Sequence, residues 1–265
     1  MRNTLAPLLI LVASTSCSIT FGGMTEKATR EAELSFAPTA GAKVLEIDSY
    51  NGSITLAVSE AGAGISGTAS VWAKGKTEEQ ALERLNQMEL QFSQNGEKVL
   101  LVLTKPSGGS NNCGAQIKTL SVPADWAIVI DGSNGNVTVP TGFENIHIDT
   151  SNGNIDVAGS GRIFVDTSNG NVNYRGGSQD FELDSSNGSI TVELKGDWSG
   201  RGMVSSSNGK ITLRCNGVID ARLSTSTSNG KAHIFGPELD PDQGQGVLNL
   251  DTSNGNISVT HNFPE

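Results

Sequence analysis

The sequence of 265 residues has few of the side chains from which metal sites and many catalytic centres are built. Its three histidines, His147, His233 and His261, lie far apart, and its three cysteines form no Cys-x-x-Cys pair. No His-Glu-x-x-His motif is present either. Zinc sites require closely spaced Cys and His ligands, so we expect neither a structural nor a catalytic zinc.

Positive charge is also scarce, because 18 Lys and Arg stand against 28 Asp and Glu, for a net charge of -10. Proteins that bind nucleic acid neutralise phosphates with Lys and Arg, so nucleic acid is not an expected partner. Anionic membrane surfaces should repel such a chain as well. A covalently attached lipid is then the only expected contact with a membrane.

The apolar run at the N-terminus, from Leu5 to Ala13, is too short to span a bilayer and is interrupted by Pro7. Arg2 precedes it, and the small residues Ser14-Thr15-Ser16 separate it from Cys17. A charged start, a short apolar core and a small-residue exit are typical of a signal peptide, here residues 1–16.

The exit resembles the lipobox of bacterial lipoproteins, in which the Cys thiol is acylated and the Cys becomes the new N-terminus. Cys17 is the candidate for this lipidation, although Ser14 stands where the motif usually has Leu. A plain secretory signal with an incidental Cys is the alternative. We expect an exported lipoprotein of the cell envelope, in the outer membrane or facing the periplasm, with a linker over residues 17–39. Ser18 after the Cys favours the outer membrane in a Gram-negative cell.

Two cysteines remain, Cys113 and Cys215. In an oxidising compartment they could form a disulfide, or they could be two separate buried thiols. The sequence leaves both interpretations open.

The dominant feature of the sequence is an Asn-Gly dipeptide, usually Ser-Asn-Gly, that recurs with similar flanking residues. Its Asn residues are Asn51, Asn134, Asn152, Asn169, Asn187, Asn208, Asn229 and Asn254. Of the 32 positions that lie six and four residues before and three and five residues after these Asn, 30 are apolar. About 12 would be expected from the 36% hydrophobic composition. Each repeat therefore reads as a strand of period two, a corner and a second strand of period two.

Two architectures fit this repeat. Asn-Gly between alternating strands is a strong hairpin signal, which would give an antiparallel meander or sandwich. In a β-solenoid, each repeat is instead one coil, and equivalent positions stack on one another from coil to coil. The identical rows favour the solenoid, so the expected fold is all-β, with the repeats over residues 126–262.

Residues 40–125 combine a first coil with a different module. The sequence Thr77-Glu78-Glu79-Gln80 is typical of a capping box and predicts a short helix to about Asn86. Alternating residues from Met88 to Leu103, with Asn95-Gly96 between them, predict a hairpin, and 117–122 another strand. We expect this module to cap the open end of the solenoid.

The order of these elements resembles the bacterial Toastrack domain, a family of unknown function that also carries the name putative adhesin. The resemblance rests on the strand Val44–Asp48 with its Asn-Gly corner, Val71–Lys74, the acidic helix, the hairpin, Ser121–Ala124 and the Ser-Asn-Gly ladder, and it covers residues 40–262. It implies a single-stranded, right-handed β-helix-like fold exposed at the cell envelope, near envelope-stress systems. It brings no catalytic residues to this chain.

An acidic row accompanies the Asn row. Asp stands three residues before the Asn in six of the eight repeats: Asp48, Asp131, Asp149, Asp166, Asp184 and Asp251. Stacked coils would bring these carboxylates to about 4.8 Å from one another, where like charges repel. We expect the carboxylates to accept corner N–H groups, with calcium bound along Asp131, Asp149, Asp166 and Asp184 as the alternative. The Asn residues are expected to supply the left-handed backbone of the corners.

The same periodicity predicts that the protein is not an enzyme. Its acidic residues form one scaffold row, and no His lies in a motif that would activate a Ser or Thr. A β-helix enzyme acting on polysaccharide is the remote alternative. An adhesion or binding module could use Trp198 and Pro237–Asp242 as contact loops toward a surface glycan. The other class is a structural or stress-sensing component that contacts another envelope protein.

Overall fold

The computed structural model describes residues 26–107, 109, 111–236 and 244–261 with their side chains, and the backbone of residues 14–20. Residues 1–13 of the predicted signal peptide therefore lie outside the described residues. The chain divides into two compact units, Met1–Gly135 and Asn136–Glu265. This division differs from the boundary expected at 125–126, because the strand over 127–134 pairs with the strand over 44–49 and so belongs to the first unit.

The first unit has two sheets and one helix. Its elements are β1 (Ser14–Thr20), β2 (Glu26–Phe36), β3 (Val44–Ser49), β4 (Ile54–Ser59), β5 (Ile65–Gly75), α1 (Glu78–Asn86), β6 (Leu90–Asn95), β7 (Lys98–Leu103), β8 (Cys113–Pro123) and β9 (Ala127–Asn134). One sheet has the order β1-β2-β5-β8-β4 and the other has the order β6-β7-β3-β9. Strands β1, β2, β5 and β8 are joined antiparallel, whereas β3 pairs in parallel with β7 and β9.

In place of the linker expected over residues 17–39, the structure has the long strand β2. It pairs antiparallel with β5 from Glu26 to Phe36 and buries Ala28, Ala32, Leu34 and Phe36. The buried side chains alternate as in any half-buried strand, but the first two are alanines. A period-two pattern of small residues is a weak hydrophobic signal, which is why composition suggested a linker.

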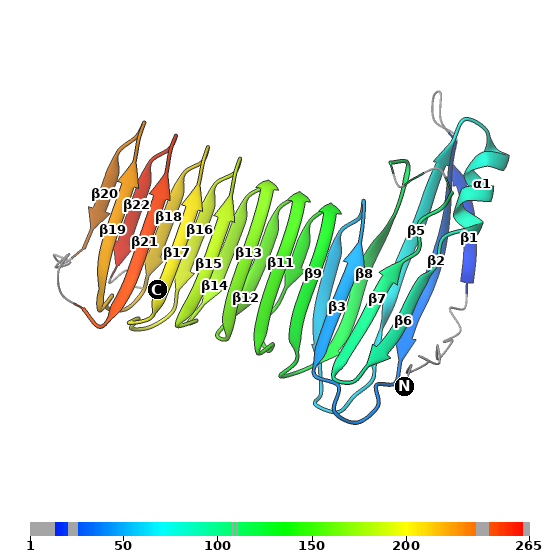
Figure 1. The fold of residues 1–265 in the computed structure, drawn as a ribbon, viewed down its shortest axis with the longest axis horizontal. Coiled ribbons are helices and arrows are strands. Elements are labelled where there is room, and N and C mark those ends of the chain that lie inside the picture. The colour runs from blue at the N-terminus through cyan, green and yellow to red at the C-terminus, as the bar shows by residue number, and fades with distance from the viewer. Residues whose placement is uncertain (1–13, 21–25, 108, 110, 237–243, 262–265) are drawn as a thin grey trace, which may run out of the picture. The chain divides into compact units, whose positions relative to one another are not determined.

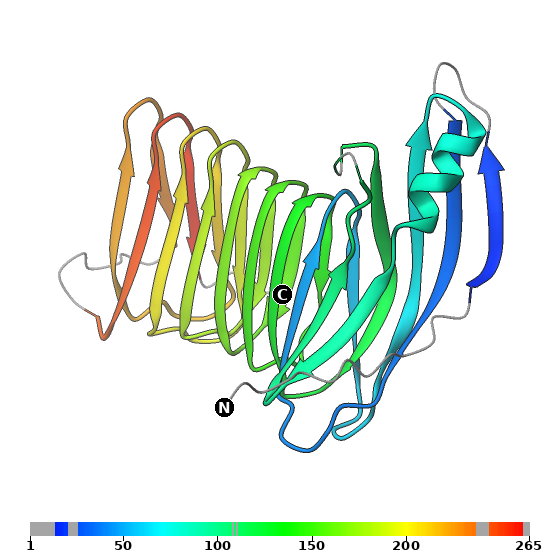
Figure 2. The same ribbon diagram turned by 45° about the vertical axis from the view of Figure 1, so that its right-hand side comes forward.

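The helix expected over residues 77–86 is present as α1, and it packs on β5 and β2 (Figure 2). Thr77 is its N-cap, and the Thr77 hydroxyl accepts a hydrogen bond from the Gln80 N–H. Ala81 and Leu85 are buried against the sheet. The hairpin expected over residues 88–103 is the antiparallel pair β6 and β7, which begins with Leu90 opposite Leu103.

The second unit consists of the repeats. Its strands are β10 (Val137–Val139), β11 (Asn145–Asn152), β12 (Ile155–Gly159), β13 (Arg162–Asn169), β14 (Val172–Gly176), β15 (Asp180–Ser185), β16 (Ile190–Leu194), β17 (Arg201–Ser206), β18 (Ile211–Cys215), β19 (Ala221–Thr227), β20 (Ala232–Phe235), β21 (Gly246–Thr252) and β22 (Ile257–His261). We call a strand, its Asn-Gly corner and the following strand a coil. The strands before the corners form the entry sheet, β11-β13-β15-β17-β21-β19, and those after them form the exit sheet, β10-β12-β14-β16-β18-β22-β20.

Pairing between coils is parallel and in register. Ile155 lies opposite Val172, as the solenoid interpretation predicts, and Ile148 lies opposite Val165. The antiparallel hairpin alternative is therefore wrong for these repeats. The predicted inward rows form the core: Ile148, Val165, Leu183, Val204 and Leu250 are all at most 2% exposed. The unit is thus built from two sheets rich in parallel strands.

The corner glycine is required because successive coils approach each other closely there. A Cβ on Gly170 would lie 1.9 Å from the carbonyl oxygen of Gly153 in the preceding coil, and one on Gly188 would lie 1.9 Å from that of Gly170. The corner Asn residues were expected to adopt a left-handed backbone. In the described part of the chain, Asn51 is the one Asn of the row with a positive φ, 50°. The corner thus selects Gly for space, and in most coils it selects Asn for another reason.

The order of the coils in space differs from their order in the sequence. The last coil, β21–β22, lies between β17–β18 and β19–β20 (Figure 1), and it pairs in parallel with both neighbours. Gly202 of β17, an exception in its apolar row, gives a reason for this order. A Cβ there would lie 2.5 Å from Phe181 Cζ and 2.8 Å from Leu248 Cδ1, so Leu248 of β21 fills the space that this glycine leaves.

Candidate functional site

The corner ladder of the second unit is a continuous chain of amide hydrogen bonds. From Asn169 onward, the Nδ2 of the Asn donates to the Oδ1 of the Asn in the adjacent coil: Asn169 to Asn152 (3.0 Å), Asn187 to Asn169 (3.0 Å), Asn208 to Asn187 (2.9 Å), Asn254 to Asn208 (2.8 Å) and Asn229 to Asn254 (2.8 Å). In the first unit, Asn134 donates to Asn51 and Asn51 donates to the Cys113 carbonyl. The Asn side chains therefore join the coils rather than face a ligand.

A second row of side chains at the corner was not predicted from the sequence. The residue two positions before each Asn is Ser or Thr in seven of the eight repeats, and it points inward. Ser185, Ser206, Thr252 and Thr227 donate to the corner glycine carbonyls of the adjacent coils, at 2.9 to 3.0 Å. These hydroxyls satisfy carbonyls that the tight stacking would otherwise leave unpaired inside the protein. Their recurrence at a fixed offset was the available signal.

Cys113 and Cys215 do not form the disulfide considered above. Each thiol is buried, the first in the first unit and the second in the second unit. The Cys215 thiol donates to the Gly196 carbonyl at 3.3 Å, and burial raises its pKa. The Cys113 pKa is also raised, chiefly by burial. A protonated, buried thiol is a poor nucleophile, so neither side chain is suited to catalysis.

The acidic row lies on the outer surface of the entry sheet. Asp149, Asp166 and Asp184 are opposite one another in register, but they do not accept the corner N–H groups as expected. The corner N–H groups bond instead to carbonyls of the adjacent coil, as Gly153 does to Asn169 and Asn187 does to Ser168. Strand pairing thus removes the donors on which the turn-capping hypothesis depended.

Burial and the proximity of neighbouring carboxylates both raise pKa values in this row. Burial, and then the charge of Asp149, raises the pKa of Asp166. Burial, and then the charge of Asp166, raises that of Asp184. In the described part of the chain, no group of three or more His, Cys, Asp or Glu side chains is placed to hold a metal ion. Calcium along Asp131, Asp149, Asp166 and Asp184 stays a prediction that unfolding with calcium and with chelator would test.

A hollow of the second unit lies further along the same outer face. It measures about 430 Å³ and is lined by residues of three adjacent strands: Met203, Val204 and Ser205 of β17, Asn249, Leu250 and Asp251 of β21, and Ser224 and Ser226 of β19. Short serines on either side of Asp251 create the depression, since Ser205, Asp251 and Ser226 lie opposite one another in register. Within the described residues, the side chains of Asn249, Ser224 and Ser226 form no hydrogen bond to the protein.

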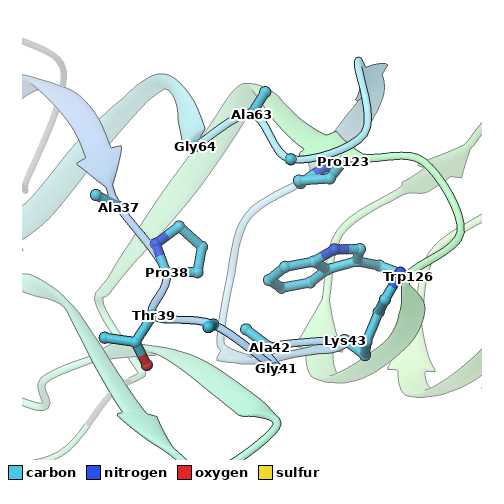
Figure 3. A pocket seen from close by; sticks show the side chains of 12 residues that line it. Ala37, Pro38, Thr39, Gly41, Ala42, Lys43, Ala63, Gly64, Pro123 and Trp126 are labelled. Atoms are coloured by element: carbon cyan, nitrogen blue, oxygen red, sulfur yellow. The ribbon is translucent and has the colours of Figure 1, made fainter.

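A second hollow, in the first unit, holds about 320 Å³ (Figure 3). Trp126 projects between Pro38 and Pro123, and the remaining lining comes mostly from Ala and Gly. The Trp126 side chain is 5% exposed, so its ring packs beneath the loops and offers little surface to a ligand. Lys43 is the one titratable residue of this lining. The hollow therefore offers few directional contacts.

Trp198 and Pro237–Asp242 were expected to form contact loops, and the structure describes the first of them. Trp198 is 1% exposed, donates from Nε1 to the Ser178 carbonyl at 2.7 Å and packs against Phe181. The expectation that Trp198 is a surface contact is therefore wrong, because its indole forms part of the core. Pro237–Asp242 lies outside the described residues.

Solved structures that are distantly similar to the chain include two adhesion-type proteins. No protein-family model matches the chain, and no curated protein is detectably similar to it. A putative cell adhesion protein from Clostridium sporogenes is 13% identical, with a TM-score of 0.35, over 88% of this chain and 99% of its own. A putative adhesin from Parabacteroides distasonis is 12% identical, with a TM-score of 0.38, over 87% of this chain and 96% of its own. No helix of the described residues is long and apolar enough to cross a membrane.

The raised pKa of Asp166 predicts that neutralising this side chain stabilises the fold, by an amount that depends on pH. A carboxyl whose pKa is higher in the folded than in the unfolded chain destabilises the fold once both forms ionise, so its cost grows as the pH rises from about 4 through the raised pKa. Asp166→Asn should therefore raise the melting temperature at pH 7, and this gain should shrink toward pH 3.5.

Asp251→Asn is the matched control, because Asp251 belongs to the same row but lies between Ser205 and Ser226 instead of between carboxylates. Thermal unfolding followed by circular dichroism gives both values. Equal effects of the two substitutions at both pH values would refute repulsion along the row.

Proposed function

We propose that the protein is an exported, lipid-anchored binding protein of the cell envelope. In this proposal it is a right-handed β-solenoid that attaches to hydroxyl-rich ligands, namely surface glycans. The observation that carries the proposal is the hollow over β17, β21 and β19. Its exposed polar side chains, among them Asn249, Asp251 and Ser226, converge from three strands whose register is fixed by backbone pairing.

The chemistry of the hollow suits sugar hydroxyls. Serine hydroxyls and the Asn249 amide both donate and accept, and the Asp251 carboxylate can accept from two neighbouring hydroxyls. Met203 offers an apolar surface for the C–H groups of a sugar ring. Because these side chains stand on paired strands, binding requires little ordering of the protein, which favours affinity.

The same lining argues for binding without chemical change. Asp251 is the one carboxylate of the hollow, and no His, Cys or Lys lines it. Hydrolysis of a glycosidic bond ordinarily takes two carboxyl groups placed on opposite sides of the bond. A ligand held here meets a single carboxylate and is retained rather than cleaved.

Substitutions in the hollow should weaken glycan binding. The purified chain is applied to an array of bacterial and host surface glycans, and Asn249→Ala and Ser226→Ala are compared with it. Each loses about one hydrogen bond to a neutral group, which corresponds to a loss of roughly fivefold to tenfold in affinity. Asn145→Ala, an exposed substitution on β11 of the same sheet, is the control and should bind as the unsubstituted chain does.

A photo-crosslinking residue at position 249 distinguishes the proposal from a stress-sensing role. In intact envelopes it should capture glycan-bearing material. Capture of a membrane signalling protein, with no glycan retained on the array, would contradict the proposal.

The lipid anchor is proposed on Cys17, whose backbone lies in β1 opposite Arg30 of β2. The pairs from Cys17 to Thr20 do not involve residues 14–16, so removal of a signal peptide before Cys17 leaves them in place. Cys17→Ser should move the protein from the membrane fraction to the soluble fraction, as followed by immunoblotting. Ser18→Ala keeps the thiol and should stay with the membranes. A natural protein that is already soluble would show that Cys17 carries no lipid.

A further inference from the structure

The coil β19–β20 ends both sheets of the second unit. Within the described residues, β19 pairs only with β21 and β20 pairs only with β22 (Figure 1). The second edge of each strand therefore presents backbone N–H and C=O groups without a strand partner. The coil is also open on its apolar side, since Ile234 and Phe235 are 47% and 55% exposed. An unpaired edge with exposed apolar residues is the surface to which extended polypeptides add as strands.

The hydrogen-bond ladder stops at this coil with an unused acceptor. Asn229 Nδ2 donates to Asn254 Oδ1, whereas no described residue donates to Asn229 Oδ1. In each preceding coil from Asn152 onward, the same oxygen accepts from the next Asn. A further Asn at the corner position of an added strand would extend the ladder by one bond.

The charges of the outer rows indicate what kind of strand fits. Basic and acidic residues alternate from strand to strand: Arg162 pairs with Asp180 at 3.2 Å, and Glu193 lies 3.8 Å from both Arg175 and Arg214. The coil β19–β20, here called the terminal coil, departs from this balance. Residues 221–236 include Arg222 and Lys231 and no acidic residue, in a chain of net charge -10. Both basic side chains are exposed.

We infer that the terminal coil is a strand-addition site for an acidic, extended polypeptide segment of another protein. Acidic side chains of the added strand complement Arg222 and Lys231, and its backbone pairs with β19 or β20. The position of β21–β22 shows that this fold accepts a coil out of chain order, by register and side-chain fit rather than by connection. Two-fold pairing of identical ends is disfavoured, because it would bring these basic residues close to their own copies.

The test uses the full chain and a synthetic peptide of the acidic coil 180–194, whose sequence is DFELDSSNGSITVEL. This peptide carries four acidic residues and the corner Asn187. Labelled peptide should bind in fluorescence anisotropy, and the double variant Arg222→Glu, Lys231→Glu should weaken binding by about tenfold or more. Both side chains are exposed, so circular dichroism should show that the variant folds. A peptide in which Asp and Glu are replaced by Asn and Gln should lose affinity similarly.

Four outcomes would overturn the inference. The first two are that no peptide binds and that binding is unaffected by the charge reversal. The third is self-association in analytical ultracentrifugation that Ile234→Ser, Phe235→Ser abolishes, since this would show that a second copy occupies the end. The fourth is binding only by the variant Glu238→Gln, Asp240→Asn, Asp242→Asn, since this would make the chain's own acidic segment the occupant. The glycan array is read separately, because it depends on substitutions of Asn249 and Ser226, which none of these variants changes.

Discussion

The structure depends on the close approach of one corner to the next. At the corners of the second unit formed by Gly170, Gly188, Gly209, Gly230 and Gly255, the glycine lies against the glycine carbonyl of the adjacent coil, at a distance that leaves no room for a Cβ. Three sets of hydrogen bonds use this proximity: the backbone pairs, the Asn amide ladder and the inward hydroxyls that donate to the glycine carbonyls. Because all three are satisfied only in one alignment, the corner fixes the register of both sheets.

Fixed register turns a repetitive sequence into defined surfaces. Side chains at one offset lie side by side on successive strands, so a single substitution within a row changes the surface locally. Burial, and then the charge of neighbouring carboxylates, disfavours ionisation of Asp166 and Asp184, whereas serines on either side of Asp251 open the hollow. Among the residues that the structure describes, the same stacking also leaves one coil with an unpaired edge and with no donor to the Asn229 oxygen. The proposed glycan site and the proposed strand-addition site thus both follow from the repeat, by different routes.

Sequence reasoning predicted what local periodicity determines. Alternating rows predicted the inward residues, the recurrent Asn-Gly predicted the corners, and the capping box at Thr77 predicted the start of the helix. It missed features that depend on which coil meets which. All coils present similar rows, so the position of β21–β22 rests on single contacts, such as Leu248 beside Gly202. The burial of Trp198 against Phe181 and the loss of donors for the acidic row also follow from neighbours distant in sequence.

The most direct test of the corner's role compares two glycine substitutions in the second unit. A Cβ on Gly170 would lie 1.9 Å from the Gly153 carbonyl oxygen, whereas a Cβ on Gly177 has the Lys195 carbonyl oxygen as its nearest neighbour, at 3.7 Å. Denaturant unfolding of the two Ala variants should show that Gly170→Ala lowers the free energy of unfolding by about 2 kcal/mol or more. Gly177→Ala should change it by less than about 1 kcal/mol. Equal stability of the two variants would contradict the corner's central role.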